Sequence, residues 1–275
     1  MPAASHNTSQ VRPEGPLFAG VDVGSLTTKA VILNGSVVGK GIIPTGVRPV
    51  QNGEVALHAA LENAGLKRED LSYVVATGYG RIKAPYANET VTEITCHAQG
   101  AHFLRPTVRT VVDMGGQDCK AIRLDEHGAV IDFAMNDKCA AGTGRFFEVM
   151  ARAFGSKLEE LGPLSLTVEE ILPMSSTCTV FAESETVSLL ARGESPAKII
   201  RGIHYAIANR ISGMFARVGV EDEVLFTGGV AKNIGMRKAL EEVLDSKILV
   251  SDFDPQLNGA LGAAVIAKSR GGSEG

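Results

Sequence analysis

Short apolar runs that end in aspartate or glycine mark the expected strands of this chain. Residues 17–25 form such a run, which closes with Asp22 and Gly24. This pattern predicts a strand followed by a tight polar turn, and residues 28–33 predict a second strand directly after it. The two strands are therefore expected to form a hairpin.

The same pattern recurs further along the chain. Residues 110–124 repeat the hairpin of residues 17–33 with a constant offset of 91 positions. The matched pairs are Asp22 and Asp113, Gly24 and Gly115, Lys29 and Lys120, Ala30 and Ala121, and Leu33 and Leu124. Self-similarity at a fixed spacing indicates an internal duplication, so we expect two equivalent hairpins.

The remaining segments alternate between helical and strand patterns. Helices are expected at residues 55–64, 145–154, 199–218 and 258–267, and strands at residues 71–77 and 224–227. This order predicts two α/β domains that face each other across a cleft. Their expected limits are residues 17–108 and 109–257, with a small-residue helix over residues 258–270 packing back on the first domain and a disordered tail over residues 1–16.

The composition is that of an ordinary globular protein and excludes several classes of partner. Of the 275 residues, 44% are apolar and 21% are charged. The 27 basic residues against 31 acidic ones give a net charge of −4, and no basic stripe favours nucleic acid or an acidic membrane. No apolar run is long enough to span a membrane, and the N-terminal segment lacks the apolar centre of a secretory signal. We therefore expect a cytoplasmic protein.

Each hairpin places glycines directly after an aspartate at the end of a strand. Glycine lets backbone N–H groups approach an anion closely, and Ser25, Thr27 and Thr28 add hydroxyl donors. If Asp22 and Asp113 face each other, they suit hydrated Mg²⁺ and a water that attacks a γ-phosphate. One glycine after a strand is usually a plain turn. Two with matched spacing favour a phosphate site.

A third glycine turn, at residues 227–233, has two readings. Its Thr-Gly-Gly sequence would let an adenine ring lie flat against the backbone, and its alternative is a plain strand-to-helix turn. The chain has no Walker A sequence, which argues against a P-loop enzyme.

In these three segments the chain resembles the ATPase superfamily of actin, the sugar kinases and the heat-shock chaperones, over about residues 17–268. The resemblance implies a duplicated actin-like (ribonuclease H-like) α/β fold that binds ATP or ADP with Mg²⁺. The expected catalytic residues are Asp22, Asp113 and Gln117. The expected nucleotide-binding residues are Gly24, Ser25, Thr27, Thr28, Lys29, Gly115, Gly116, Gln117, Asp118, Gly228, Gly229 and Asn233.

The four cysteines divide into two kinds. Cys139 and Cys178 each lie in a polar turn that is followed at once by a helical pattern, and a helix N-terminus favours the thiolate that iron–sulfur clusters require. Two such thiols per chain would become four in a twofold dimer, although a buried, inert thiol is the commoner state of any single cysteine. Cys96 and Cys119 are expected to be structural, and His97 beside Cys96 is expected to be an interior residue.

The segments around Cys139 and Cys178 resemble a narrower family. NDKCAAGTGRF at residues 136–146 and STCTVFAESE at residues 176–185 are similar to the activators of (R)-2-hydroxyacyl-CoA dehydratases and to the ATPase subunits of benzoyl-CoA reductases. ATGYGR at residues 76–81 and GALGAA at residues 259–264 also match. The resemblance implies that Cys139 and Cys178 of each subunit of a homodimer hold one bridging 4Fe-4S cluster, with both following helices pointing their N-termini at it.

The same resemblance implies an activity and its partners. Ferredoxin or flavodoxin would supply an electron, and ATP hydrolysis would drive it from the cluster to an acyl-CoA dehydratase or reductase that contains iron–sulfur centres. The alternatives are a permanent ATPase subunit of a benzoyl-CoA reductase, a sugar kinase and an actin-like scaffold without iron. A heterodimer with a paralogue would supply the same number of thiols.

Overall fold

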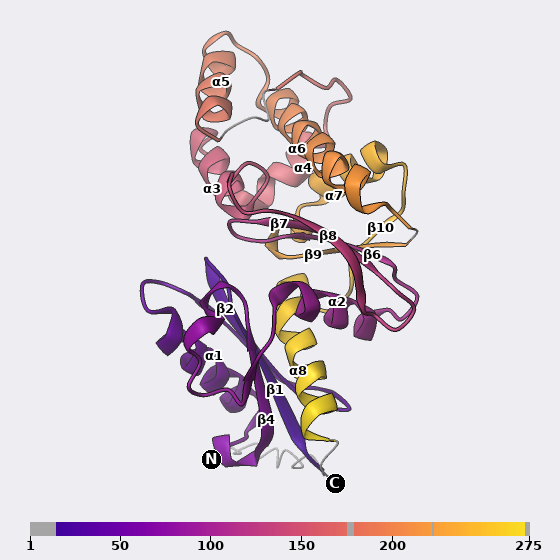
Figure 1. Ribbon diagram of the computed structural model, residues 1–275. Coiled ribbons are helices and arrows are strands. Elements are labelled where there is room, and N and C mark those ends of the chain that lie inside the picture. The colour runs from indigo at the N-terminus through magenta and orange to yellow at the C-terminus, as the bar shows by residue number, and fades with distance from the viewer. Residues whose placement is uncertain (1–14, 175–178, 222, 273–275) are drawn as a thin grey trace, which may run out of the picture.

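Two five-stranded sheets with the same connectivity organise the chain (Figure 1). The computed structural model describes residues 15–174, 179–221 and 223–272. The first sheet contains β1 (Leu17–Val23), β2 (Thr27–Asn34), β3 (Ser36–Pro44), β4 (Leu71–Thr77) and β5 (Glu89–Thr90). The second contains β6 (Thr110–Met114), β7 (Cys119–Leu124), β8 (Val130–Asn136), β9 (Val224–Thr227) and β10 (Ile248–Leu249).

The strand orders confirm the predicted duplication. The first sheet runs β3-β2-β1-β4-β5, and the second, taken from its other edge, runs β8-β7-β6-β9-β10. In each sheet the first three strands are antiparallel, and the fourth pairs in parallel with the first. The register also matches, because Asp22 lies opposite Lys29 and Asp113 lies opposite Lys120.

The duplication extends further than the sequence comparison indicated. Thr77 at the end of β4 pairs with Asp22, as Thr227 at the end of β9 pairs with Asp113. Each threonine is followed by a glycine in the same left-handed conformation, Gly78 with φ 86° and Gly228 with φ 85°. A side chain on either glycine would collide with the main chain of the neighbouring hairpin strand, so both turns require glycine.

Eight helices are seen in the described residues. They are α1 (Pro49–Ala64), α2 (Glu93–Leu104), α3 (Gly144–Ala153), α4 (Leu161–Ser165), α5 (Thr179–Ala191), α6 (Pro196–Val218), α7 (Ile234–Leu244) and α8 (Asn258–Gly271). The helices expected at residues 55–64 and 199–218 begin several residues earlier, each with a proline in the first turn, where its missing N–H costs nothing.

The central strands of both sheets are buried on both faces. In β2, Ala30 and Ile32 pack toward α1, whereas Val31 and Leu33 pack toward α8, which explains the continuous apolar run of this strand. The second sheet packs one face on α2 and the other on a larger core that α3, α6 and α7 share. Helices α2 and α8 therefore lie between the two sheets (Figure 1).

Helices α2 and α8 touch through small residues. A side chain on Gly262 of α8 would overlap the main-chain oxygen of Cys96 in α2. On its other side α8 lies against β1, where Gly20 leaves room for the main chain of Ala260. The sequence GALGAA thus allows α8 to pack on the first sheet and on α2 together, as the small-residue pattern predicted.

Candidate functional site

A cavity of about 380 Å³ lies between the two hairpins and the third glycine turn. The first hairpin contributes residues around Gly24, the second contributes residues around Gly115, and β9 contributes the turn that begins at Gly228. Sequence elements separated by about two hundred positions therefore line one cavity. Its walls include Asp22, Gly24, Ser25, Thr27, Lys29, Gly115, Gly116, Asp118, Gly228, Gly229 and Asn233, all of which the sequence singled out.

Two of the expected nucleotide-binding residues lie elsewhere. The Thr28 side chain is buried and shares a hydrogen bond of 2.9 Å with the Thr45 hydroxyl, so it supports the loop beneath the first hairpin. Gln117 is exposed in the turn of the second hairpin and is not among the residues that line the cavity. The catalytic role expected for Gln117 therefore has no support in the cavity wall.

Each hairpin carries an aspartate–lysine pair at the same register, but in different surroundings. Lys29 Nζ lies 3.4 Å from Asp22 Oδ2, and Lys29 also lines the cavity. Lys120 is almost fully buried and meets three carboxylates: Asp113 and Glu93, each at 3.3 Å, and Asp118 at hydrogen-bond distance. The first lysine has spare hydrogen-bonding capacity toward the cavity, whereas the second is fully engaged.

The Asp113 carboxylate is saturated by donors. Thr227 Oγ1 donates to its Oδ1 at 2.8 Å, His97 Nδ1 lies 3.3 Å from the same oxygen, and Lys120 Nζ lies 3.3 Å from Oδ2. Burial alone would raise the pKa of this carboxyl group, but His97 and Lys120 lower it to about 2. Asp113 is therefore ionised at neutral pH and has little capacity to accept a further proton.

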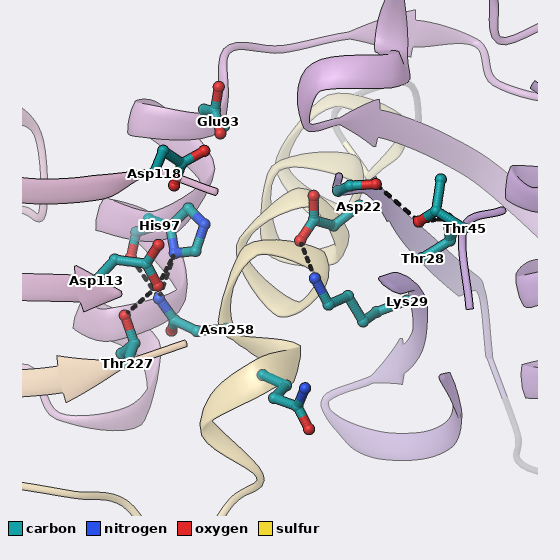
Figure 2. A network of polar contacts seen from close by, with 12 residues as sticks. Asp22, Thr28, Lys29, Thr45, Glu93, His97, Asp113, Asp118, Thr227 and Asn258 are labelled. Carbon is teal, nitrogen blue, oxygen red and sulfur yellow. Dashed lines mark hydrogen bonds and ion pairs between the residues drawn. The ribbon is translucent and has the colours of Figure 1, made fainter. Parts of the chain in front are cut away.

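Sequence reasoning missed two polar residues on α2 that reach the cavity. Glu93 begins the helix and His97 lies one turn later, so both project from the same face into the space between the sheets (Figure 2). His97 is buried, as expected, but it contacts Asp113 rather than Cys96. The spacing of Glu93 and His97 on one helix was the available signal, since both carry groups that can act on a phosphate or its water.

Asn233 lines the cavity beside the third turn, and a series of hydrogen bonds fixes its side chain. Its Oδ1 accepts from Met236 N at the start of α7, and its Nδ2 lies 3.1 Å from His204 Nε2. His204 Nδ1 lies 3.1 Å from the Ser165 hydroxyl. Burial lowers the pKa of His204 to about 3, so the ring is neutral and can accept from Asn233 while donating to Ser165.

Cys139 lies outside the cavity wall, in the turn between β8 and α3. Its thiol is half-buried, and Arg210 Nη1 of α6 lies 3.5 Å from Sγ. Asn136 donates to the Cys139 main-chain oxygen at 2.9 Å and lies 3.3 Å from the same guanidinium. The Arg210 guanidinium thus contacts both ends of the turn, at Asn136 and at Cys139. Cys178, the second expected ligand, lies outside the described residues.

The sequence pattern predicted a helix directly after Cys139, but the helix begins later. Residues 140–143 form a turn, and α3 starts at Gly144. The first helical N–H groups are used by the second hairpin, because Gly144 N donates to Gly115 O at 2.8 Å and Arg145 N donates to Gly116 O at 3.0 Å. These two groups therefore hold α3 against the turn of the second hairpin rather than pointing at Cys139.

Cys96 and Cys119 are buried in the fold, as expected. Burial raises the pKa of both thiols to about 12, so neither is a thiolate at neutral pH. Cys119 Sγ lies 3.5 Å from Gly142 O, which ties β7 to the turn that carries Cys139. Among the described residues no group of three or more histidine, cysteine or acidic side chains is arranged to hold a metal ion. No helix in the described part of the chain is long and apolar enough to cross a membrane.

Comparison with known proteins agrees with this geometry. Residues 19–267 match the BadF/BadG/BcrA/BcrD ATPase family. The chain is 51% identical over 252 residues to the activator of lactoyl-CoA dehydratase of Anaerotignum propionicum, covering 90% of this chain and 96% of that protein. It is 36% identical to a subunit of the benzoyl-CoA reductase of Thauera aromatica, covering 90% of this chain and 92% of that protein.

Solved structures show the same fold in close relatives. Component A of the (R)-2-hydroxyglutaryl-CoA dehydratase of Acidaminococcus fermentans superposes with a TM-score of 0.89 at 43% identity, covering 94% of this chain and all of that one. The activator of the 2-hydroxyisocaproyl-CoA dehydratase of Clostridium difficile, solved with bound ADPNP, gives a TM-score of 0.87 at 41% identity, covering 94% of this chain and 96% of that one.

Proposed function

The chain belongs to the BadF/BadG/BcrA/BcrD ATPase family, and from this premise we propose that it is an ATP-dependent activator that delivers electrons to an acyl-CoA dehydratase. The observation that carries the proposal is the direct hydrogen bonding between the phosphate-binding turn of the second hairpin and the helix that follows Cys139. This contact joins a nucleotide site to a cysteine that has the surroundings of an anionic ligand.

ATP or ADP fits the cavity by its chemistry. The glycines of the two hairpins line the cavity with no side chain to block the approach of a phosphate to the backbone, and Lys29 adds a positive charge on the same wall. The third turn, with Asn233 fixed by His204, would take the adenosine. Asp22 and Asp118 would hold Mg²⁺ through its water shell, because hydrated Mg²⁺ prefers carboxylate partners.

The residues around Cys139 fit one ligand of an iron–sulfur cluster. The residue is half-buried rather than enclosed in the core, and the Arg210 guanidinium lies 3.5 Å from its sulfur. We propose that Cys139 and Cys178 from each of two subunits bind a shared 4Fe-4S cluster, which supplies one-electron transfer at low potential when bound. The donor would be a reduced ferredoxin or flavodoxin, which loses one electron as the dehydratase gains it.

Closure of the cavity on ATP would move the Cys139 turn. Gly115 and Gly116 line the cavity on one side, where they would meet the nucleotide, and accept hydrogen bonds from the start of α3 on the other. Cys119 adds a second tie, because it lies at the start of β7 and meets Gly142. A displacement of the second hairpin is therefore transmitted to the turn that holds Cys139. Nucleotide binding can favour the displaced position only if the contacts of the nucleotide differ between the open and closed states.

The first test is the iron and acid-labile sulfide content of protein purified without oxygen. We expect about two irons per chain, the share of one chain in a dimer with one four-iron cluster. The Cys139→Ser and Cys178→Ser variants should each lose this iron, whereas Cys119→Ser should keep it. An iron-free wild-type protein that hydrolyses ATP would contradict the proposal and favour a kinase or scaffold.

The second candidate is the ATPase subunit of a benzoyl-CoA reductase, because a subunit of that enzyme is among the relatives. The higher identity to a dehydratase activator favours the first candidate. Purification of the tagged chain from its native cells separates the two. An activator should elute separately from its acceptor enzyme in gel filtration, whereas a reductase subunit should elute together with its partner subunits at fixed stoichiometry.

A further inference from the structure

His97 connects the two halves of the cavity. It lies on α2, contacts Asp113 of the second sheet through Nδ1 at 3.3 Å, and lines the cavity although it is buried. Figure 2 shows its ring between Asp113 and Asp22, with the other ring nitrogen directed away from Asp113. A side-chain carbon placed on Gly259 would lie 3.1 Å from His97 Nε2 and 3.0 Å from Asp22 Oδ2. Both polar atoms therefore border the same small space.

Both oxygens of the Asp113 carboxylate already have partners, although the residue lines the cavity. These partners are Thr227, His97 and Lys120, and the side chain is almost fully buried. A buried carboxylate that accepts a hydrogen bond from an imidazole fixes the orientation and the tautomer of that ring. The imidazole of His97 is bonded to this carboxylate and lines the same cavity.

The contacts of Nδ1 determine the orientation of the imidazole. Because Asp113 is ionised, Nδ1 carries the hydrogen and donates it to Oδ1. The Asn258 amide lies 3.3 Å from the same nitrogen, but it donates to the main-chain oxygen of His97 at 3.0 Å. Nε2 is thus the position left for a cavity partner. It accepts a hydrogen bond in the neutral ring and donates one in the imidazolium, so either form can hold a water.

We propose that His97 holds the water that attacks the γ-phosphate of ATP, with Nε2 as one partner of this water and the Asp22 carboxylate as the other. The inference rests on the proposed ATPase function and assigns a residue to it. The water oxygen bonds to the γ-phosphorus, the bond from that phosphorus to the ADP oxygen breaks, and both hydrogens of the water leave with the phosphate as H₂PO₄⁻. Asp113 is a positioning residue that acts through His97.

This arrangement makes hydrolysis depend on closure of the cavity. His97 is bonded to the second sheet through Asp113, whereas Asp22 belongs to the first sheet. A water with partners on both sheets is held only while Nε2 and the Asp22 carboxylate border the same space, as they do here, and it would be lost if the sheets moved apart. In phosphoryl transfer the protein contributes mostly by positioning, so this dependence would limit hydrolysis in the open state.

Two substitutions separate the contacts of the ring. In His97→Asn the amide nitrogen takes the place of Nδ1 and keeps a donor for Asp113, but nothing replaces Nε2. In His97→Gln the longer side chain brings an amide to the place of Nε2. We expect His97→Asn to lower kcat for ATP hydrolysis by about 100-fold or more, with KM for ATP within about threefold, and His97→Gln to recover at least about tenfold of the loss.

The matched control is His102→Asn on the same helix, since His102 is not among the cavity residues and should keep the wild-type kcat. ADP affinity by calorimetry and thermal unfolding are measured on all variants. A His97→Asn variant with unchanged kcat would overturn the inference, as would one whose loss lies in KM. If His97→Asn does not fold, His97→Gln is compared with the wild type instead. A His97→Gln variant that folds but whose kcat is lowered by about 100-fold or more then overturns the inference. Wild-type protein that binds ATP without hydrolysing it would instead overturn the proposed function.

Discussion

Lys29 and Lys120 occupy equivalent positions in the two hairpins, so replacing each by methionine gives a controlled comparison. Lys120 is 2% exposed and pairs with Asp113, Asp118 and Glu93. Burial by itself would lower the pKa of Lys120, but the three carboxylates raise it above its ordinary value. Removing one partner of a buried ion pair typically costs about 3–5 kcal/mol, because the charges left behind stay buried. Lys120→Met leaves three carboxylates without their cation.

Lys29→Met should cost much less stability. Lys29 has one carboxylate partner at 3.4 Å, and its side chain is 13% exposed. The loss of one charged hydrogen bond corresponds to about 1.5–3 kcal/mol. In a chain of this size about 1 kcal/mol lowers Tm by about 2–4 °C, so the expected decreases are about 3–12 °C for Lys29→Met and about 6–20 °C for Lys120→Met.

The assay is urea unfolding followed by circular dichroism, because the chain contains no tryptophan for fluorescence. Both variants should keep the wild-type dependence of the free energy of unfolding on urea, and Lys120→Met should have the lower midpoint. Equal losses in the two variants, or a larger loss for Lys29→Met, would refute the reasoning that the second hairpin carries the buried charge cluster.

Three further predictions concern packing, thiol chemistry and acid stability. Gly262→Ala should lower the free energy of unfolding by about 1–3 kcal/mol, because the added carbon overlaps α2. Gly213→Ala inside α6, where no atom lies within 4 Å of the added carbon, should raise it by about 0.5–1 kcal/mol. Equal effects of the two substitutions in urea unfolding would contradict this prediction. Iodoacetamide at pH 8 should alkylate Cys139 in the folded apoprotein and spare the buried Cys119, whose pKa is raised to about 12. Peptide mass spectrometry measures the labelling of each cysteine. Equal labelling of the two would contradict the assignment of Cys119 as a buried structural thiol. Because burial lowers the pKa of His204 from 6.5 to about 3, the unfolded chain takes up this proton first, so the free energy of unfolding should fall by up to about 1.4 kcal/mol per pH unit as pH drops below 6.5. His204→Gln should remove that part of the slope, and an unchanged slope would contradict the assignment.

The two hairpins could be predicted because each is local in sequence. The offset between Asp22 and Asp113 is sufficient to identify the strands, the turns and the register of the aspartate–lysine pairs. The equivalence of Gly78 and Gly228 was missed because the connections before β4 and β9 differ in length, so no constant offset relates them. Only the shared position beside β1 and β6 reveals that relation.

The polar residues of α2 were not predicted because their environment is tertiary. Cys96 and His97 are adjacent in sequence, but adjacent residues of a helix point about 100° apart. Cys96 packs into an apolar cluster with Phe18 and Val75, whereas His97 turns to Asp113. The start of α3 was displaced for a similar reason, because Gly144 and Arg145 use their N–H groups on the second hairpin rather than near Cys139.

The most direct test of ATP-driven electron delivery is the oxidation of the dithionite-reduced protein, freed of excess reductant, on mixing with an acyl-CoA dehydratase. It is followed by absorbance in the absence and presence of ATP. The proposal predicts that wild-type protein is oxidised rapidly only with ATP, and that Asp113→Asn retains its iron but is not oxidised at that rate. Equal rates with and without ATP, or ATP-dependent oxidation that persists in Asp113→Asn, would contradict the coupling of the nucleotide site to electron transfer.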